Sequence, residues 1–193
     1  PPPPPPPRNV NVPGAGPLDK NEVYDPATNS WATAKATPAP IRGHAATAYN
    51  GKIYLLGGNA DPYTNTVSVY DPAADSWSTA ASMPKTLAYG AAVTHGDKIY
   101  YIGGDYVTVE APEDMFGGAL IYDAAANTWD TTVYKMAEVV EVYGQAALNP
   151  ANGKIYLFGG LYWDDAQGGE QGSTTIETFD TATKTWSVVD ALF

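Results

Sequence analysis

The chain has no cysteine among its 193 residues, which excludes disulfides, thiolate metal sites, iron–sulfur clusters and cysteine nucleophiles. It also has only two histidines, His44 and His95, which is few for a metal centre or an acid–base enzyme. These two lie at different places in the repeated pattern of the chain, so we expect both to be structural. We therefore predict no catalytic residue, no metal and no cofactor, and we expect that the chain is not an enzyme.

Basic residues are scarce as well, with 10 Lys and Arg against 21 Asp and Glu, for a formal charge of −11. Such a surface repels phosphate backbones and anionic membranes. The apolar runs are short, as at 53–56, and far below the roughly 20 residues that a membrane-crossing helix needs. We expect neither nucleic acid nor membrane insertion among its interactions.

The sequence has no recognisable signal peptide and no initiator methionine, and it begins with seven prolines. We therefore expect a processed chain or a piece of a longer one. Its hydrophobic fraction of 44% is enough for a substantial core, and a single domain is the default expectation at this length.

A repeat dominates what the sequence does contain. Four times an aromatic residue is followed by tryptophan seven positions later: Tyr24 and Trp31, Tyr70 and Trp77, Tyr122 and Trp129, Phe179 and Trp186. A second phrase precedes the last three copies: KIYLLGG from Lys52, KIYYIGG from Lys98 and KIYLFGG from Lys154. Successive tryptophans of this pattern are 46, 52 and 57 residues apart. A period near 50 with hairpin signals indicates propeller blades rather than a helical solenoid.

Each repeat reads as a four-stranded antiparallel meander. In the first complete copy we expect strands at 44–49, 52–56, 66–70 and 77–79, and Asn50-Gly51 favours a tight type I′ turn between the first two. Alanine pairs on the first strand suit the crowded centre of a ring. Glycine pairs end the second strand, where positive φ and close backbone approach are needed. We expect the tryptophans on the outermost strand, where a large ring covers the gap between sheets.

These phrases resemble kelch repeats over about 23–189, nearly the whole chain apart from the proline head. The resemblance is specific, because the seven-residue spacing holds in all four copies. The WD-type propeller is the nearest alternative, but Trp-Asp does not recur as a strand ending. We therefore predict an all-β fold, a β-propeller of kelch-type four-stranded antiparallel blades.

The blade count predicts an incomplete ring. Residues 1–21 form a proline-rich segment, with a candidate degenerate strand at 8–16, and residues 22–193 form the propeller. The propeller comprises a partial blade at 22–37 and three complete blades at about 38–82, 83–136 and 137–190. Propellers have 4 to 8 blades, and open sheet edges tend to pair with other chains. Further repeats missing from this piece, or another chain, would complete the ring; a closed four-blade ring lacking an inner strand is the alternative.

The candidate binding site lies in the loops that join second to third strands, where the repeats differ most in length. These loops combine aromatic side chains with carboxylates, which suits sugar recognition or a basic peptide, although a merely solvated acidic face is an equal alternative. Adjacent carboxylates alone are weak evidence for Ca²⁺. The candidate residues are Asp61, Tyr63, Asp105, Tyr106, Glu113, Asp114, Phe116, Tyr162, Trp163, Asp164 and Asp165.

The proline head will adopt a stiff polyproline II rod. It reads as a linker or spacer, or as a stalk of an extracellular glycoprotein with modified prolines. The sequence has no Asn-x-Ser/Thr sequon, so sugars would be O-linked. The candidate O-glycosylation sites are Pro1, Pro2, Pro3, Pro4, Pro5, Pro6, Pro7, Thr37, Pro38 and Pro40. An extracellular location follows from this reading, with a cytoplasmic one as the alternative.

The first functional hypothesis is a non-enzymatic interaction or scaffold module that is a structural component of an extracellular, proline-rich, O-glycosylated assembly. Its partner would be a protein or further copies of itself. The alternatives are a carbohydrate-binding propeller that takes a glycan and an intracellular kelch adaptor. A sugar-modifying enzyme ranks last, because no acid–base pair is evident in the inner strands.

Overall fold

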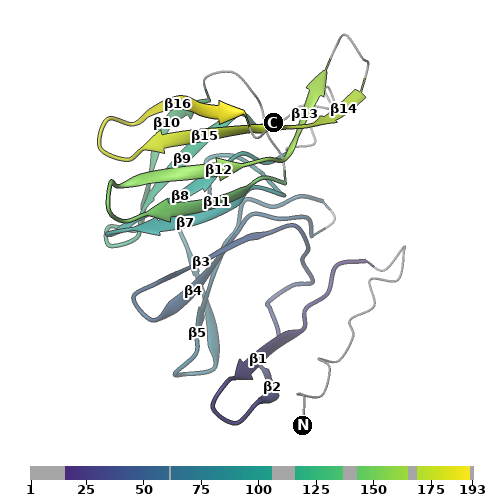
Figure 1. Ribbon diagram of the computed structural model, residues 1–193. Helices are drawn as coiled ribbons and strands as arrows, with labels where there is room; N and C mark the ends of the chain where they lie inside the picture. The colour runs from purple at the N-terminus through teal and green to yellow at the C-terminus, as the bar shows by residue number, and fades with distance from the viewer. Residues whose placement is uncertain (1–15, 61, 106–115, 137–142, 165–168, 192–193) are drawn as a thin grey trace.

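The computed structural model describes residues 16–60, 62–105, 116–136, 143–164 and 169–191, and all regular structure in them is β-strand. Figure 1 shows sheets that fan out one after another along the chain. A two-stranded sheet comes first, with β1 (Asn21–Asp25) and β2 (Ser30–Ala34). The first complete sheet follows, with β3 (Ala45–Tyr49), β4 (Lys52–Leu56), β5 (Val67–Asp71) and β6 (Ser76–Ala80).

Two further sheets have the same construction. The second comprises β7 (Ala91–His95), β8 (Lys98–Ile102), β9 (Gly118–Asp123) and β10 (Thr128–Lys135). The third comprises β11 (Gln145–Asn149), β12 (Lys154–Phe158), β15 (Thr175–Asp180) and β16 (Thr185–Ala191). In each, neighbouring strands pair antiparallel in meander order. The predicted all-β fold with four-stranded antiparallel blades is confirmed, and β1 and β2 supply the outer half of a partial blade.

The local sequence explains the meander. Asn50 and Gly51 both have positive φ, as the predicted type I′ hairpin between β3 and β4 requires. In the outer turn, the carboxylate of Asp71 accepts the backbone N–H groups of Ala73 and Ala74 at 3.0 and 3.2 Å. Such an Asx turn reverses the chain within a few residues, which fixes the register that pairs Tyr70 with Trp77.

The cores lie between blades rather than within them. Tyr54, Leu56 and Val69 of the first complete blade pack in one buried cluster with Ile99 and Tyr101 of the next. A second cluster joins the next two blades in the same way. The middle sheet contributes residues to both clusters, and because it is covered on both faces, its strands β8 and β9 are nearly continuous apolar runs. The fold is therefore stabilised mainly by blade-to-blade contact.

Gly57 shows why the second strand ends in a glycine pair. Its φ is +62°, and a Cβ at this position would lie 2.2 Å from the carbonyl oxygen of Leu87. Gly58 then donates its N–H to the same oxygen at 2.8 Å. The turn thus brings the backbone of one blade against the entry of the next, as close approach at a glycine allows.

Each blade is attached to the preceding one through a tryptophan and a turn residue. Trp77 donates its indole N–H to the carbonyl oxygen of Lys35 at 2.9 Å. The carboxylate of Asp75 accepts the backbone N–H of the same Lys35 at 2.7 Å and also the hydroxyl of Tyr70 at 2.7 Å. Both backbone groups of one residue are therefore engaged. We call this arrangement the Trp–Asx pair.

The next blade repeats this contact. Trp129 donates to the carbonyl oxygen of Ala81 at 2.8 Å, and the side-chain oxygen of Asn127 accepts the N–H of Ala81 at 2.7 Å. The hydroxyl of Tyr122 donates to the same Asn127 oxygen at 2.6 Å. The seven-residue spacing from the aromatic residue to tryptophan is thus the sequence signature of a blade joint.

One element departs from the prediction. The segment expected to be a loop after Gly160 forms a hairpin of β13 (Leu161–Asp164) and β14 (Gly169–Gly172), which projects beyond the sheets at the upper right of Figure 1. No helix in the described residues is long and apolar enough to span a bilayer.

Candidate functional site

Two of the predicted loop residues come together at one end of the blades. The hydroxyl of Tyr63, from the loop after β4, donates to the carboxylate of Asp105 at 3.0 Å. Asp105 lies in the corresponding loop after β8. Burial raises the pKa of Tyr63 well above its ordinary value, and the bond to Asp105 adds to that rise. The phenol is therefore a neutral hydrogen-bond donor, and its role here is to join two loops.

Two tyrosines that the sequence analysis did not single out complete an aromatic cluster with Tyr63. The rings of Tyr63 and Tyr89 are 6.1 Å apart, and those of Tyr89 and Tyr143 are 4.9 Å apart. Both Tyr89 and Tyr143 have positive φ. The N–H of Tyr143 donates to the carbonyl oxygen of Tyr89, whose own N–H donates to Gly43. An alignment of the three repeats at the residues before each inner strand would have found them.

The other predicted site residues do not join this cluster as described. Tyr162 lies on strand β13, opposite Gln171, rather than in a loop. Phe116 is a correction: its ring is only 4% exposed and belongs to the core between two blades, so it cannot contact a ligand. Trp163 and Asp164 lie in β13 by their backbone. Outside the described residues lie Asp61, Tyr106, Glu113, Asp114 and Asp165.

The predicted modification sites divide in the same way. Pro38 and Pro40 are exposed and lie in the segment that leads into the first complete blade. The hydroxyl of Thr37 is half-buried and donates to the carbonyl oxygen of Ala39 at 2.9 Å. Residues 1–15, with the seven prolines and most of the candidate strand at 8–16, lie outside the described residues.

A cavity lies beside the partial blade, and the sequence analysis did not foresee it. Its volume is about 460 Å³. Its lining includes Asn21, Glu22 and Val23 of β1 and no residue of β2, and within the described residues β1 pairs with β2 alone. Its apolar lining includes Val23, Ile41, Ile53, Leu55, Tyr70 and Trp77.

The burial of equivalent residues shows what the cavity lacks. Ile99 and Ile155, the second residues of β8 and β12, are fully buried against the blade before them. Ile53 has the same place in β4 but is only half-buried, because no strand lies opposite it in the described part of the first blade. We call this space the first-blade cavity.

His44 also lines the first-blade cavity. Burial lowers the pKa of its imidazole, so the ring is neutral at physiological pH. Its Nδ1 has no hydrogen-bond partner among the described residues. The other histidine, His95, contacts the hydroxyl of Thr181 in the next blade at 3.2 Å, which agrees with a structural role.

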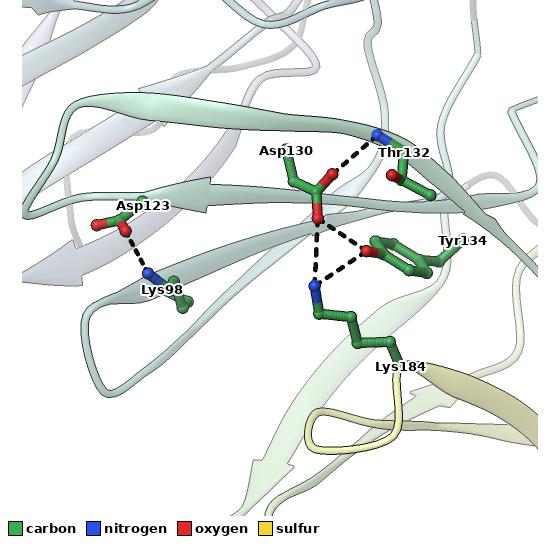
Figure 2. A network of polar contacts seen from close by, with 6 residues as sticks. All are labelled: Lys98, Asp123, Asp130, Thr132, Tyr134 and Lys184. Carbon is green, nitrogen blue, oxygen red and sulfur yellow. Dashed lines mark hydrogen bonds and ion pairs between the residues drawn. The ribbon is translucent and has the colours of Figure 1, made fainter.

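A polar network that includes an ion pair joins the last two blades. Figure 2 shows Lys184, from the outer turn of the last blade, reaching Asp130 at 3.2 Å and the hydroxyl of Tyr134 at 3.0 Å on β10. The N–H of Thr132 and the hydroxyl of Tyr134 hold the pKa of Asp130 well below its ordinary value. Lys98 and Asp123 form a separate ion pair beside it.

This network has a structural explanation. In the other joints the turn residue is Asp or Asn and accepts an N–H, but Lys184 stands at that place and cannot accept. It instead donates to the neighbouring blade, while Trp186 keeps the usual bond, here to the carbonyl oxygen of Tyr134 at 2.9 Å. We therefore assign these charges to blade attachment rather than to a ligand.

The comparisons with known proteins agree with this architecture. The family described as Attractin/LZTR1 β-propeller matches residues 15–191. The solved structure of YjhT is similar, with 21% identity and a TM-score of 0.72, over 91% of this chain and 63% of that one. The chain thus spans less than two thirds of the length of YjhT. No curated protein matches it. Because the family match covers nearly every blade strand, the chain belongs to the Attractin/LZTR1 family of kelch-type β-propellers.

Proposed function

We propose that the chain is a non-enzymatic protein-interaction module that binds an extended segment of a partner along β1. The observation that carries this proposal is the first-blade cavity: an apolar space of about 460 Å³ beside a strand edge that no described strand pairs. An exposed edge offers backbone N–H and C=O groups to an added strand. The cavity beside it takes the side chains that such a strand presents.

The complete blades define what the partner segment should resemble. There, second strands such as KIYLLGG pair with the third strand and direct Tyr54 and Leu56 into the interface with the next blade. An alternating aromatic and aliphatic segment would contact Ile53 and Leu55 in the same way. Its affinity would come from main-chain hydrogen bonds and its specificity from the cavity.

A peptide titration tests this proposal. The probe is a fluorescein-labelled synthetic hairpin of residues 45–58, the sequence of β3 and β4, measured by fluorescence anisotropy. We expect saturable binding and a loss of about tenfold in affinity, or 1.4 kcal/mol, for Val23→Asp, which puts a charge on the cavity wall. Val189→Asp is the matched control, since both valines are on strands in the outer half of a blade and are 54% and 56% exposed.

The control should bind as the parent chain does. A probe with N-methylated backbone in its second strand should bind weakly, because it cannot donate to β1. The proposal fails if no probe binds saturably, or if Val23→Asp and Val189→Asp bind equally well.

A carbohydrate-binding function is the second candidate, favoured by the cluster of Tyr63, Tyr89 and Tyr143. Tyr143 is 50% exposed, and aromatic faces stack on the C–H surfaces of sugars. A glycan array compared between the parent chain and Tyr143→Ala tests it. Binding that the substitution abolishes would support it, and an array without signal would reject it.

The setting is proposed as extracellular, in a proline-rich, O-glycosylated assembly. The exposure of Pro38 and Pro40 and the seven leading prolines support this proposal. Intact mass spectrometry of the native material tests it, because attached pentose or hexose masses would be visible directly. An unmodified chain recovered from cytosol would favour the intracellular adaptor instead.

A further inference from the structure

The first outer hairpin carries a Trp–Asx pair that holds nothing in the described residues. Asn29 and Trp31 have the sequence places of Asp75 and Trp77. The hydroxyl of Tyr24 donates to Asn29 at 2.7 Å, just as Tyr70 donates to Asp75. The side chains are therefore arranged as in the joints at Trp77 and Trp129, where the Trp–Asx pair holds the preceding blade. Yet Trp31 is 45% exposed, and its indole N–H has no described partner.

The joints between the described blades show which groups a Trp–Asx pair binds. At Trp77 and Trp129 the tryptophan donates to the carbonyl oxygen, and the turn residue accepts the N–H, of one residue just past the outer strand of the preceding blade, Lys35 or Ala81. Both groups are backbone groups. The ligand of Asn29 and Trp31 is accordingly the end of a blade's outer strand, whatever side chain it carries.

The opposite end of the molecule presents a blade face that no described residue covers. Tyr156 and Phe158 are stacked there, with ring centroids 6.3 Å apart. At the same places in the two preceding blades, Leu56 and Ile102 are 0% and 1% exposed beneath the next blade, whereas Phe158 is 41% exposed. This open face of the last blade has the strand positions that another blade would cover.

The strand end that Asn29 and Trp31 would bind is also in the last blade. Tyr134, the residue held by Trp186, lies opposite Ala119 in β9. Asp190 has the corresponding place in β16, opposite Ile176. Its carbonyl oxygen is thus the equivalent acceptor for a tryptophan indole N–H that arrives from outside.

We propose that the partner is a second copy of this chain, docked head to tail, so that Asn29 and Trp31 of one copy hold the end of β16 of the other. This inference rests on the proposed interaction function and names a partner for it, but it uses the other face of the half-blade. Both complementary surfaces are on every copy, and such a heterologous contact generates a closed ring or an open chain. At a net charge of −11 the copies repel each other, so added salt strengthens the contact.

Sedimentation velocity from micromolar to millimolar concentration tests the proposal. The parent chain should associate with concentration, and more so at higher salt. Trp31→Ala removes the pair but keeps the open face, and Phe158→Asp does the reverse, so each variant alone should be monomeric. Mixed together they should form a one-to-one dimer that grows no further, because each variant supplies the surface that the other lacks.

Val23→Asp, on the cavity side of the same half-blade, should associate as the parent does. This control separates the two proposals, since it weakens peptide binding and leaves association intact. Near-ultraviolet circular dichroism confirms that each variant is folded, and Trp31→Phe is a milder substitution that removes the indole N–H alone. The inference is overturned if the parent stays monomeric throughout, if Trp31→Ala and Trp31→Phe associate as the parent does, or if the mixture of folded variants forms no dimer.

Discussion

The indole N–H of Trp129 and the carbonyl oxygen of Ala81 lie 2.8 Å apart, although the two residues are 48 positions apart in the sequence. Trp129 also packs against Tyr122, its neighbour across the strand pair, with ring centroids 5.0 Å apart. One side chain thus stabilises its own blade through the ring and the previous joint through the nitrogen. This double role explains why tryptophan recurs at a fixed distance from an aromatic residue.

Removing the indole N–H at an occupied joint should cost stability. Trp129→Phe leaves the carbonyl of Ala81 without its donor, and we expect a loss of about 1 to 2 kcal/mol in the free energy of unfolding. Trp31→Phe is the matched control and should change it by less than about 0.5 kcal/mol in dilute solution. Urea titrations measure both, and equal losses in the two variants would contradict the assignment.

The acceptor at the joint can be tested in the same way. Asn127→Gly removes the acceptor of two hydrogen bonds, from Ala81 and Tyr122, while glycine tolerates the φ of 55° at this turn. We expect a loss of roughly 1 to 3 kcal/mol. Asn29→Gly loses only the bond from Tyr24 and should cost less than half as much. Thermal unfolding ranks the two variants, and the reverse order would contradict the role of Asn127.

The network of Figure 2 predicts a pH dependence. Because the pKa of Asp130 is lower in the fold than its ordinary 3.8, its ionised form stabilises the protein above about pH 4, and this contribution disappears as the pH falls through the lower folded value. The free energy of unfolding of the parent and of Asp130→Asn should therefore differ most at neutral pH and converge in acid. A difference that is the same at pH 7 and at about pH 2 would rule out this account.

Substitutions at two glycines with positive φ distinguish the effect of backbone strain from the effect of close contact. Gly51→Ala meets no atom within 4 Å and should cost about 1 kcal/mol from the left-handed backbone alone. Gly57→Ala would also put its Cβ 2.2 Å from the carbonyl oxygen of Leu87, and we expect a distinctly larger loss. Equal losses in the free energy of unfolding of the two variants, measured with urea, would mean that the backbone at Leu87 moves away without a penalty.

The sequence predicted the strands well because their causes are local. Asn50-Gly51 sets a hairpin, and the aromatic-to-tryptophan spacing follows from a four-residue outer turn and cross-strand pairing of Tyr70 with Trp77. The hairpin of β13 and β14 was not predicted, because it interrupts the repeat at a single place and the other copies have no corresponding segment to compare with it. Its turn lies outside the described residues.

The candidate site was less predictable, because it depends on which blades are neighbours. Phe116 lies in a sequence segment that is predicted to be a loop, yet its side chain is buried between blades. Tyr89 and Tyr143 attracted no attention as single residues and meet only because successive inner strands converge. The first-blade cavity lies where the described half-blade lacks strands. A sequence motif marks residues that are present, so no motif could predict this space.

The most direct test of the joint as the organising contact is the hydrogen exchange of the indole N–H groups, followed by nuclear magnetic resonance at low and high protein concentration. Trp77, Trp129 and Trp186 should be protected at both concentrations, because their partners are in the same chain. Trp31 should exchange rapidly in dilute solution and become protected as copies associate. A Trp31 that exchanges equally fast at every concentration, or that is protected even in dilute solution, would contradict the account.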